Sequence, residues 1–378
     1  MWYVSRKECI ESEERWMGKL LENIDLHIPI IQAGMAGGIS TPKLVAEVAN
    51  AGALGTIGAG YMSASSLRNE IEQVKQLTNK PFAVNLFATN LEAFASDLAP
   101  MQRVLDKFRK ELEIEDGLKN VKVYDYLQEK IYVIIEQDIP VVSTAFGVLS
   151  SVLIERLKKN NVILIGMATN LEEAKLLVES GYDIIVAQGF EAGGHRGTFD
   201  IKKYPNGCSI GLLSLVQEFL ESLHVPIVAA GGISTKEQID ALLSMGAAGV
   251  QLGTRFLVAK EAGTNTAYRR ELIKSSSLDT TITKAFSGRP ARAVRNRFIK
   301  ELESSDCELL PFPIQNELTK DIRAASKEFT KAEYQSLWAG QGVGSIVEEA
   351  SAADILAALI GEKPEETNQM KLEFNEDE

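Results

Sequence analysis

The sequence is poor in cysteine and histidine, with 3 residues of each type among 378. Cys9, Cys208 and Cys307 stand far apart and form no Cys-x-x-Cys pair, so we expect neither a disulfide framework nor a metal site. No apolar run approaches the ~20 residues of a membrane span, and the N-terminus mixes Lys, Arg and Glu where a signal peptide would be apolar. We therefore expect a cytoplasmic protein with no membrane partner.

An excess of positive charge is also missing, because 40 Lys and Arg residues face 52 Asp and Glu residues, for a net charge of −12. Neutralising nucleic-acid phosphates requires clustered Lys and Arg, so we expect no nucleic-acid partner. The Gly-x-Gly-x-x-Gly fingerprint of a dinucleotide fold is absent after the first expected strand. What remains is an apolar content of 45% and a charged content of 24%, which are ordinary for a globular enzyme.

The pattern that is present is a regular alternation of short apolar runs with helical stretches. Eight runs are expected to be strands, and each is followed by a helical pattern, over about the length of one (β/α)₈ barrel. A doubly wound sheet would more often use five or six strands. The sequence therefore predicts a TIM barrel over residues 27–263. The eight expected strands are 27–32, 53–57, 81–87, 140–144, 162–166, 183–187, 226–230 and 249–253.

Two stretches interrupt this alternation. Residues 91–137 are charged, helical in pattern and too long for an ordinary connection, so we expect a helical insert beside the site. Residues 264–360 are expected to form a smaller helical C-terminal lobe. Residues 1–26 form an N-terminal segment in this scheme, and the polar, mostly acidic residues 361–378 are expected to be a disordered tail.

The loop after the sixth expected strand carries the most distinctive chemistry. Asp183 to Ala187 is a short β-branched run, and the segment Gly189 to Thr198 then places four glycines around His195. Glycine lets a flat ligand approach the backbone closely, and histidine can move a proton near neutral pH. Loops that leave the strands of a barrel are where such folds keep their active sites. The sequence therefore predicts that His195 is catalytic.

The loops after the last two strands are expected to bind a phosphate. They contain Gly231-Gly232 and Gly253-Thr254 at the positions where barrels often hold phosphate with backbone N–H groups and a helix N-terminus. The first loop, Gly34 to Gly38, is uncharged and small around Met35, which suits stacking on a flat ring. With Asn85 and Gln188 as polar contacts at neighbouring strand ends, these loops predict a phosphorylated flat heterocycle, FMN.

These motifs together resemble those of the nitronate monooxygenases, formerly called 2-nitropropane dioxygenases. The resemblance runs from about Ile28 to Gly342, and its most specific part is Glu191-Ala-Gly-Gly-His-Arg-Gly197. Further parts are Gln32 to Gly38, Phe286 to Arg292 and Trp338 to Gly342. The resemblance implies a TIM barrel with non-covalent FMN, with His195 as the base, and the oxidation of alkyl nitronates such as propionate 3-nitronate by O₂ to a carbonyl compound and nitrite. The FMN contacts expected are Met35, Ala36, Asn85, Gln188, Gly193, Gly194, Gly231, Gly232, Gln251, Leu252, Gly253 and Thr254.

Several alternatives stay open at this stage. The same core resembles flavin-dependent enoyl-(acyl-carrier-protein) reductases, and a flavin-free phosphate-binding lyase or isomerase is a third reading, although no strand end offers a lysine for a Schiff base. His195 could abstract the α-proton of a neutral nitroalkane or, when protonated, hold a nitronate anion. Phe312 departs from the tyrosine that is frequent in the family, and we assign it no role. The roles of Arg289 and Arg292, the use of NAD(P)H and the choice between monomer and homodimer are left undecided.

Overall fold

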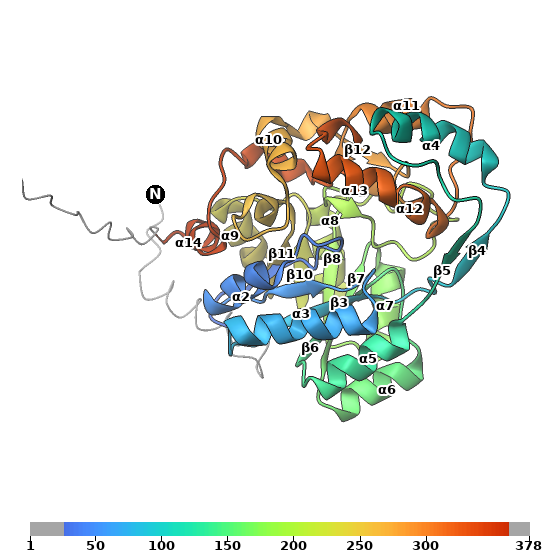
Figure 1. Ribbon diagram of the computed structural model, residues 1–378. Coiled ribbons are helices and arrows are strands. Elements are labelled where there is room, and N and C mark those ends of the chain that lie inside the picture. The colour runs from blue at the N-terminus through green and yellow to red at the C-terminus, as the bar shows by residue number, and fades with distance from the viewer. Residues whose placement is uncertain (1–25, 363–378) are drawn as a thin grey trace, which may run out of the picture.

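A computed structural model of the chain describes residues 26–362 (Figure 1). The expected N-terminal segment up to residue 25, and the expected acidic tail beyond its first two residues, lie outside the described residues. Within residues 26–362, no helix combines the length and apolar character needed to cross a membrane.

The centre of the molecule is an eight-stranded parallel sheet with the strand order β1-β11-β10-β8-β7-β6-β3-β2. A parallel bridge between Ile31 and Leu54 brings the segment before β2 against β1, so the sheet closes on itself as a barrel. The predicted TIM-barrel fold is therefore confirmed. The strands are β1 (Ile30–Gln32), β2 (Thr56–Gly58), β3 (Ala83–Phe87), β6 (Val141–Ala145), β7 (Ile163–Ala168), β8 (Ile184–Gln188), β10 (Ile227–Ala230) and β11 (Gly249–Leu252).

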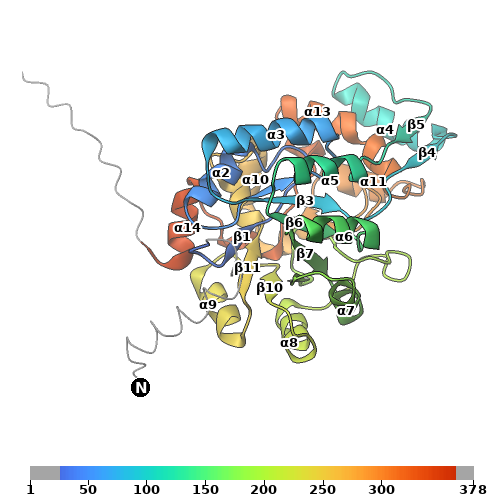
Figure 2. The same ribbon diagram turned by 90° about the horizontal axis from the view of Figure 1, so that it is seen from below.

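Helices cover the outside of this barrel and bury the outer face of its strands, while the inward side chains of the strands pack against one another inside it, so both faces are buried as a parallel sheet requires (Figure 2). Two of these helices begin at hydroxyl caps, because the side chains of Thr41 and Ser63 accept from the backbone N–H groups of Leu44 and Ser66. The helices of the ring are α2 (Pro42–Asn50), α3 (Ala64–Leu77), α5 (Leu127–Glu136), α6 (Ser151–Lys159), α7 (Leu171–Glu179), α8 (Leu212–Ser222), α9 (Lys236–Met245) and α14 (Ala352–Ile360).

The two stretches outside the alternation differ in detail from the expectation. Helix α5 packs between α3 and α6, and α14 packs between α2 and α9, so both belong to the barrel ring. The stretch expected to be helical after residue 264 also contains two strands, β12 (Thr280–Thr283) and β13 (Ala291–Val294), which pair with each other and with the short strand β9 (Gly194–His195). The division of the chain into domains stays a prediction.

The remaining residues of the insert and of the C-terminal stretch form one cap over an end of the barrel (Figures 1 and 2). They share an apolar core in which Phe108 of the insert packs 4.8 Å from the ring of Phe298. The buried Arg109 guanidinium also crosses between the two, donating to the Asp321 carboxylate at 2.7 Å and to the Leu318 carbonyl at 2.7 Å. The cap contains β4 (Ala93–Ala95), α4 (Ala99–Glu111), β5 (Val121–Val123), α10 (Thr266–Lys274), α11 (Arg297–Glu303), α12 (Ile314–Leu318) and α13 (Lys320–Glu328), with short 3₁₀ turns at Ser277–Asp279, Ala332–Tyr334 and Gln341–Ser345. A further 3₁₀ turn, Thr254–Val258, follows β11 in the barrel.

Candidate active site

The carboxyl ends of the barrel strands open into a cavity beneath the cap, which we call the inner chamber. All thirteen residues that the sequence predicts for the site line this chamber, so residues spread over 220 positions meet in one place. They are Met35, Ala36, Asn85, Gln188, Gly193, Gly194, His195, Gly231, Gly232, Gln251, Leu252, Gly253 and Thr254. Lining a common cavity does not assign a role to any of them, and their individual contacts to a ligand stay predictions.

The loop that carries His195 is fixed from below by Gln188 and Arg196. The Gln188 amide donates to the carbonyl of His195 at 3.1 Å and accepts from the backbone N–H of Gly197 at 2.8 Å. The buried Arg196 guanidinium donates to the Gly189 carbonyl at 2.7 Å and so ties the loop back to the end of β8. Both ends of the Gln188 amide are therefore engaged in holding the loop, a task that the sequence did not indicate.

A contact with the cap explains why the loop has no side chain at residue 193. A Cβ atom on Gly193 would stand 2.3 Å from the backbone nitrogen of Gly340, closer than real Cβ atoms come. The backbone N–H of Gln341 donates to the Glu191 carbonyl at 2.9 Å in the same region. The Trp338 to Gly342 turn of the cap thus lies directly against the loop that carries His195.

His195 is held by the cap as well as by its own loop. In the pairing of β9 with β13 it lies opposite Ala291, and its Nε2 atom lies 2.8 Å from the hydroxyl of Ser287. The rings of Trp338, Phe146 and Phe312 surround the imidazole, with centroids at 5.2, 5.9 and 6.4 Å. The imidazole of His195 is therefore hydrogen-bonded to a serine on one side and is surrounded by aromatic rings on the others.

This environment disfavours the charged form of His195. Removal from bulk water, followed by the positive charges of Arg289 and Arg323, lowers the pKa of His195 to about 3. The Arg289 guanidinium is buried, lies 3.9 Å from the centroid of the Phe146 ring and donates to the Thr198 carbonyl. The imidazole is therefore neutral at neutral pH, which favours the role of a base over that of a cation.

The loops expected to bind a phosphate offer free backbone donors. Within residues 26–362, the N–H groups of Gly232, Ile233 and Thr254 have no hydrogen-bond partner. Gly232 has φ of +69°, and the side chain of Gln238 at the start of α9 holds this loop by accepting from the Ser234 N–H at 2.7 Å. Unpaired donors beside a helix N-terminus attract an anion. The residues present thus fit a phosphate-bearing cofactor.

The first loop and Asn85 form a further part of the wall of the inner chamber. A Cβ atom on Gly34 would stand 2.5 Å from the Cβ of Asn85, so this glycine is required by the close approach of β3. The Asn85 amide donates to the Ser143 hydroxyl at 2.9 Å, and no described residue donates to its oxygen. Asn85 is therefore a partly satisfied amide that keeps an acceptor available to a ligand.

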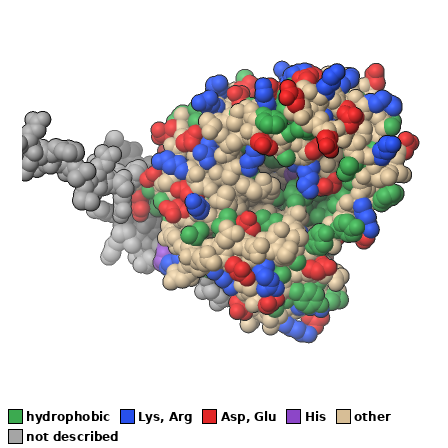
Figure 3. All heavy atoms as spheres, in the orientation of Figure 1, with side chains coloured by type: hydrophobic (Ala, Val, Ile, Leu, Met, Phe, Trp, Pro, Cys, Tyr) green, Lys and Arg blue, Asp and Glu red, His purple; other side chains and the backbone are tan. Residues whose placement is uncertain are grey.

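A second cavity, which we call the outer chamber, continues from the inner one toward solvent. The two share six lining residues, which are Ala36, Ile39, Tyr61, His195, Tyr268 and Trp338. The face of the molecule shown in Figure 3 is hollowed near its centre, with basic side chains beside the hollow. The cationic residues that line the outer chamber are Lys122, Lys130, Lys320, Arg323 and Lys327, against a single lining acid, Glu317. This local reversal of the chain's net negative charge favours anionic ligands.

Several residues around His195 were given no role by sequence reasoning. Phe146 and Arg323 stand on a loop and a helix without a recognisable pattern, and Phe312 differs from its family counterpart. Ser287 and Trp338 lie within motifs that carry the family resemblance, and this membership was the feature of the sequence that could have placed them near the site. Among residues 26–362, neither Arg289 nor Arg292 forms an ion pair. Arg292 donates to the Phe190 carbonyl at 2.9 Å and Arg289 to the Thr198 carbonyl, so both hold backbone segments together.

The fold and the chamber define a (β/α)₈ barrel with unpaired backbone donors and a buried histidine at its capped end. The model of the nitronate monooxygenase family matches residues 19–362, and the chain belongs to this family. A probable nitronate monooxygenase of Staphylococcus aureus (strain N315) is 41% identical over 326 residues, which are 85% of this chain and 91% of that protein. The expected family and the expected class of enzyme, a flavin-dependent oxidoreductase, are confirmed.

Two solved structures are similar over nearly the whole length. Nitroalkane oxidase from Streptomyces ansochromogenes is 37% identical with a TM-score of 0.83, covering 91% of this chain and 97% of its own. FabK from Thermotoga maritima is 27% identical with a TM-score of 0.70, covering 90% of this chain and 94% of its own. The greater similarity to the nitroalkane oxidase agrees with the family assignment.

Proposed function

We propose that this protein binds FMN in the inner chamber and uses O₂ to oxidise alkyl nitronates, propionate 3-nitronate among them, to a carbonyl compound and nitrite. One observation carries the proposal: His195 and the free N–H groups of Gly232, Ile233 and Thr254 belong to the same chamber. A flavin whose phosphate lies on those N–H groups would share the chamber with the imidazole. When bound, FMN supplies the electron-accepting chemistry, which no side chain of the chamber can supply.

The residues of the chain then bind, orient and deprotonate the substrate. The cations of the outer chamber attract an anionic nitronate, and the rings of Phe146, Phe312 and Trp338 exclude water from the space around His195. For a neutral nitroalkane, the neutral imidazole can remove the α-proton and create the nitronate in place. A nitronate that arrives as an anion does not need this step.

The test is direct. The purified protein should be yellow, release FMN and not FAD on heat denaturation, and form nitrite and carbonyl compound from propionate 3-nitronate in an O₂-dependent reaction. A colourless protein that takes up no added FMN would contradict the cofactor, while a yellow protein without nitrite formation would contradict the reaction alone.

The basic outer chamber keeps one alternative under consideration, namely a flavin-dependent enoyl-thioester reductase, because the phosphates of a nucleotide reductant or an acidic carrier would also suit it. Such an enzyme consumes NAD(P)H when an enoyl thioester is supplied. Nitrite formation without any NAD(P)H requirement, together with no enoyl-dependent NAD(P)H oxidation, would separate the proposed function from this alternative.

A further inference from the structure

The hydroxyl of Ser287 makes three contacts, and its single proton restricts how they can be arranged. Its oxygen lies 2.8 Å from Nε2 of His195, 3.2 Å from the backbone nitrogen of Arg289 and 3.2 Å from the carbonyl oxygen of Arg289. A serine hydroxyl has one proton to donate and two lone pairs to accept with. The partners of Ser287 therefore decide which nitrogen of His195 carries the imidazole proton.

The two backbone partners have fixed roles. The Arg289 N–H can only donate, so it takes one lone pair of the hydroxyl, and the Arg289 carbonyl can only accept, so it takes the proton. The remaining lone pair then faces Nε2, which must donate to it. If Ser287 donated to Nε2 instead, the Arg289 carbonyl would lack a partner within residues 26–362, although this residue is buried at 3% exposure.

We propose that Ser287 is a positioning residue that holds His195 as its Nε2–H tautomer and thereby makes Nδ1 the atom that accepts the substrate proton. Within the part of the chain that the structure describes, no group forms a hydrogen bond with Nδ1, and the imidazole lines both chambers. The proposal rests on the proposed role of His195 as a base and specifies the atom that performs it.

The surroundings of Ser287 make this arrangement rigid. Ser287 itself is 1% exposed, and the neighbouring Arg289 is fixed at its other end, where its guanidinium donates to the Thr198 carbonyl and covers the Phe146 ring. The pairing of β9 with β13 sets the distance between His195 and this turn, because Ala291 lies opposite His195. His195 therefore receives its orientation from a part of the chain 92 positions away.

The tautomer can be read without any catalysis. The chain has 3 histidines, so a ¹⁵N-histidine-labelled sample of the full-length purified protein gives a simple spectrum, and His195 is assigned by the loss of its signals in His195→Asn. At pH 7 the pattern of two- and three-bond couplings from the ring nitrogens to Hδ2 and Hε1 should identify a single Nε2–H tautomer for His195. An Nδ1–H pattern would overturn the proposal, whatever the protein's activity.

The functional half of the test uses Ser287→Ala, with Ser287→Thr as the variant that restores a hydroxyl. In Ser287→Ala, the couplings of His195 should become those of a mixture of tautomers, and kcat/KM for neutral nitroethane should fall by about tenfold or more. The value for preformed ethylnitronate should change much less, and Ser287→Thr should recover part of the loss. A variant with wild-type couplings and an unchanged ratio of the two substrate activities would contradict the positioning role, even if its melting temperature is lower.

Discussion

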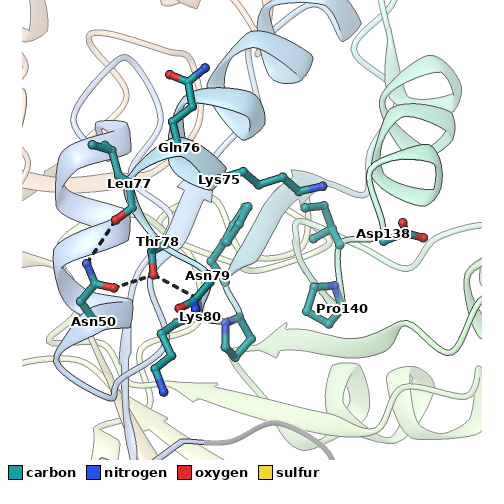
Figure 4. Close-up of a pocket in the computed structure, with 12 residues that line it drawn as sticks. Asn50, Lys75, Gln76, Leu77, Thr78, Asn79, Lys80, Asp138 and Pro140 are labelled. Atoms are coloured by element: carbon teal, nitrogen blue, oxygen red, sulfur yellow. Dashed lines mark hydrogen bonds between the residues drawn. The ribbon is translucent and has the colours of Figure 1, made fainter.

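The two ends of the barrel each carry a pocket, and they differ in how their polar groups are paired. At the amino ends of the strands, the pocket in Figure 4 is formed by the ends of α2 and α3 and by the residues before β3 and β6. Several of its polar groups are paired: the Thr78 hydroxyl donates to Asn50 at 2.6 Å and accepts from the Lys80 N–H at 3.0 Å, while Lys75 donates to the Gln137 carbonyl at 2.6 Å.

At the carboxyl ends, in contrast, groups remain available to a ligand. The N–H groups of Gly232, Ile233 and Thr254 and the Nδ1 atom of His195 have no partner within residues 26–362. Because burying an unpaired polar group costs free energy, a chamber that retains several of them is built to be completed by a bound molecule. Unpaired donors gathered beside a buried histidine, and not a hollow in the surface alone, are the reason for placing the proposed active site at this end of the barrel.

We expect the largest effect from Gly232→Val, which should abolish ligand binding at the carboxyl end of the barrel. Its Cβ would stand 3.0 Å from the Cβ of Glu191 at a φ of +69°, and the branched side chain would occupy the space beside the free N–H groups. FMN retention should be lost while the barrel still folds, as measured by flavin absorbance and far-UV circular dichroism.

A matched control separates this loss from backbone strain. Gly246→Val introduces the same side chain at a φ of +114° at the other end of α9, outside both chambers. This variant should lower the melting temperature and keep its flavin. Equal flavin loss in both variants, or full flavin in Gly232→Val, would mean that the phosphate is bound elsewhere.

The next largest effect is expected from His195→Asn. Since the pKa of His195 is lowered to about 3, the imidazole is neutral and can serve as the proposed base, and its removal should reduce turnover of neutral nitroethane by about 10²–10⁴. Turnover of ethylnitronate should fall much less, because this substrate is already deprotonated. Parallel steady-state assays with the two substrates give the comparison, and unimpaired activity on both would leave His195 a structural member of its loop.

The barrel and the composition of the chamber could be predicted from sequence because both depend on local patterns. The eight apolar runs at regular spacing specify a parallel barrel, and the carboxyl ends of its strands necessarily meet at one end. Asn85, Gly232 and Thr254 could therefore be brought together in advance although they lie on three different strand ends. Family resemblance then added His195 as the base.

The surroundings of His195 could not be predicted, because they depend on tertiary contacts that leave no local pattern. Strand β9 has 2 residues and exists only by pairing with β13, so nothing near His195 in the sequence points to Ser287. The low pKa of His195 likewise depends first on its burial under the cap and then on the charges of Arg289 and Arg323, which come from other segments. The expected helical lobe hid the strands for the same reason, since Ala291–Val294 is a short run that only its partners hold extended.

A smaller effect is expected from removing one positive charge at each end of the barrel. Lys320→Gln removes one cation from the outer chamber and should raise KM for anionic nitronates a few-fold, with a smaller dependence on ionic strength and little change in kcat. Lys75→Gln makes the same substitution in the pocket at the amino end and should leave KM unchanged. Equal effects of the two variants would show that only the net charge of the protein matters.

The smallest expected effect concerns the pH dependence of stability at the two ends. Burial and the charges of Arg289 and Arg323 lower the pKa of His195 in the folded state to about 3. The ordinary histidine pKa, which applies to the unfolded chain, is about 6.5. Between these two pH values the unfolded chain therefore binds a proton at His195 and the folded chain does not. The contribution of His195 to stability is therefore complete above pH 6.5 and is lost as the pH falls toward 3. Between pH 7 and 5, the melting temperature of the flavin-free wild type should fall more steeply than that of His195→Asn, by a slope equivalent to at most about one proton.

Thr78→Val removes an uncharged member of the network at the amino end, so it should lower the melting temperature by a similar amount at both pH values. Identical slopes for the wild type and His195→Asn would contradict the lowered pKa of His195 and, with it, the preference for a neutral base.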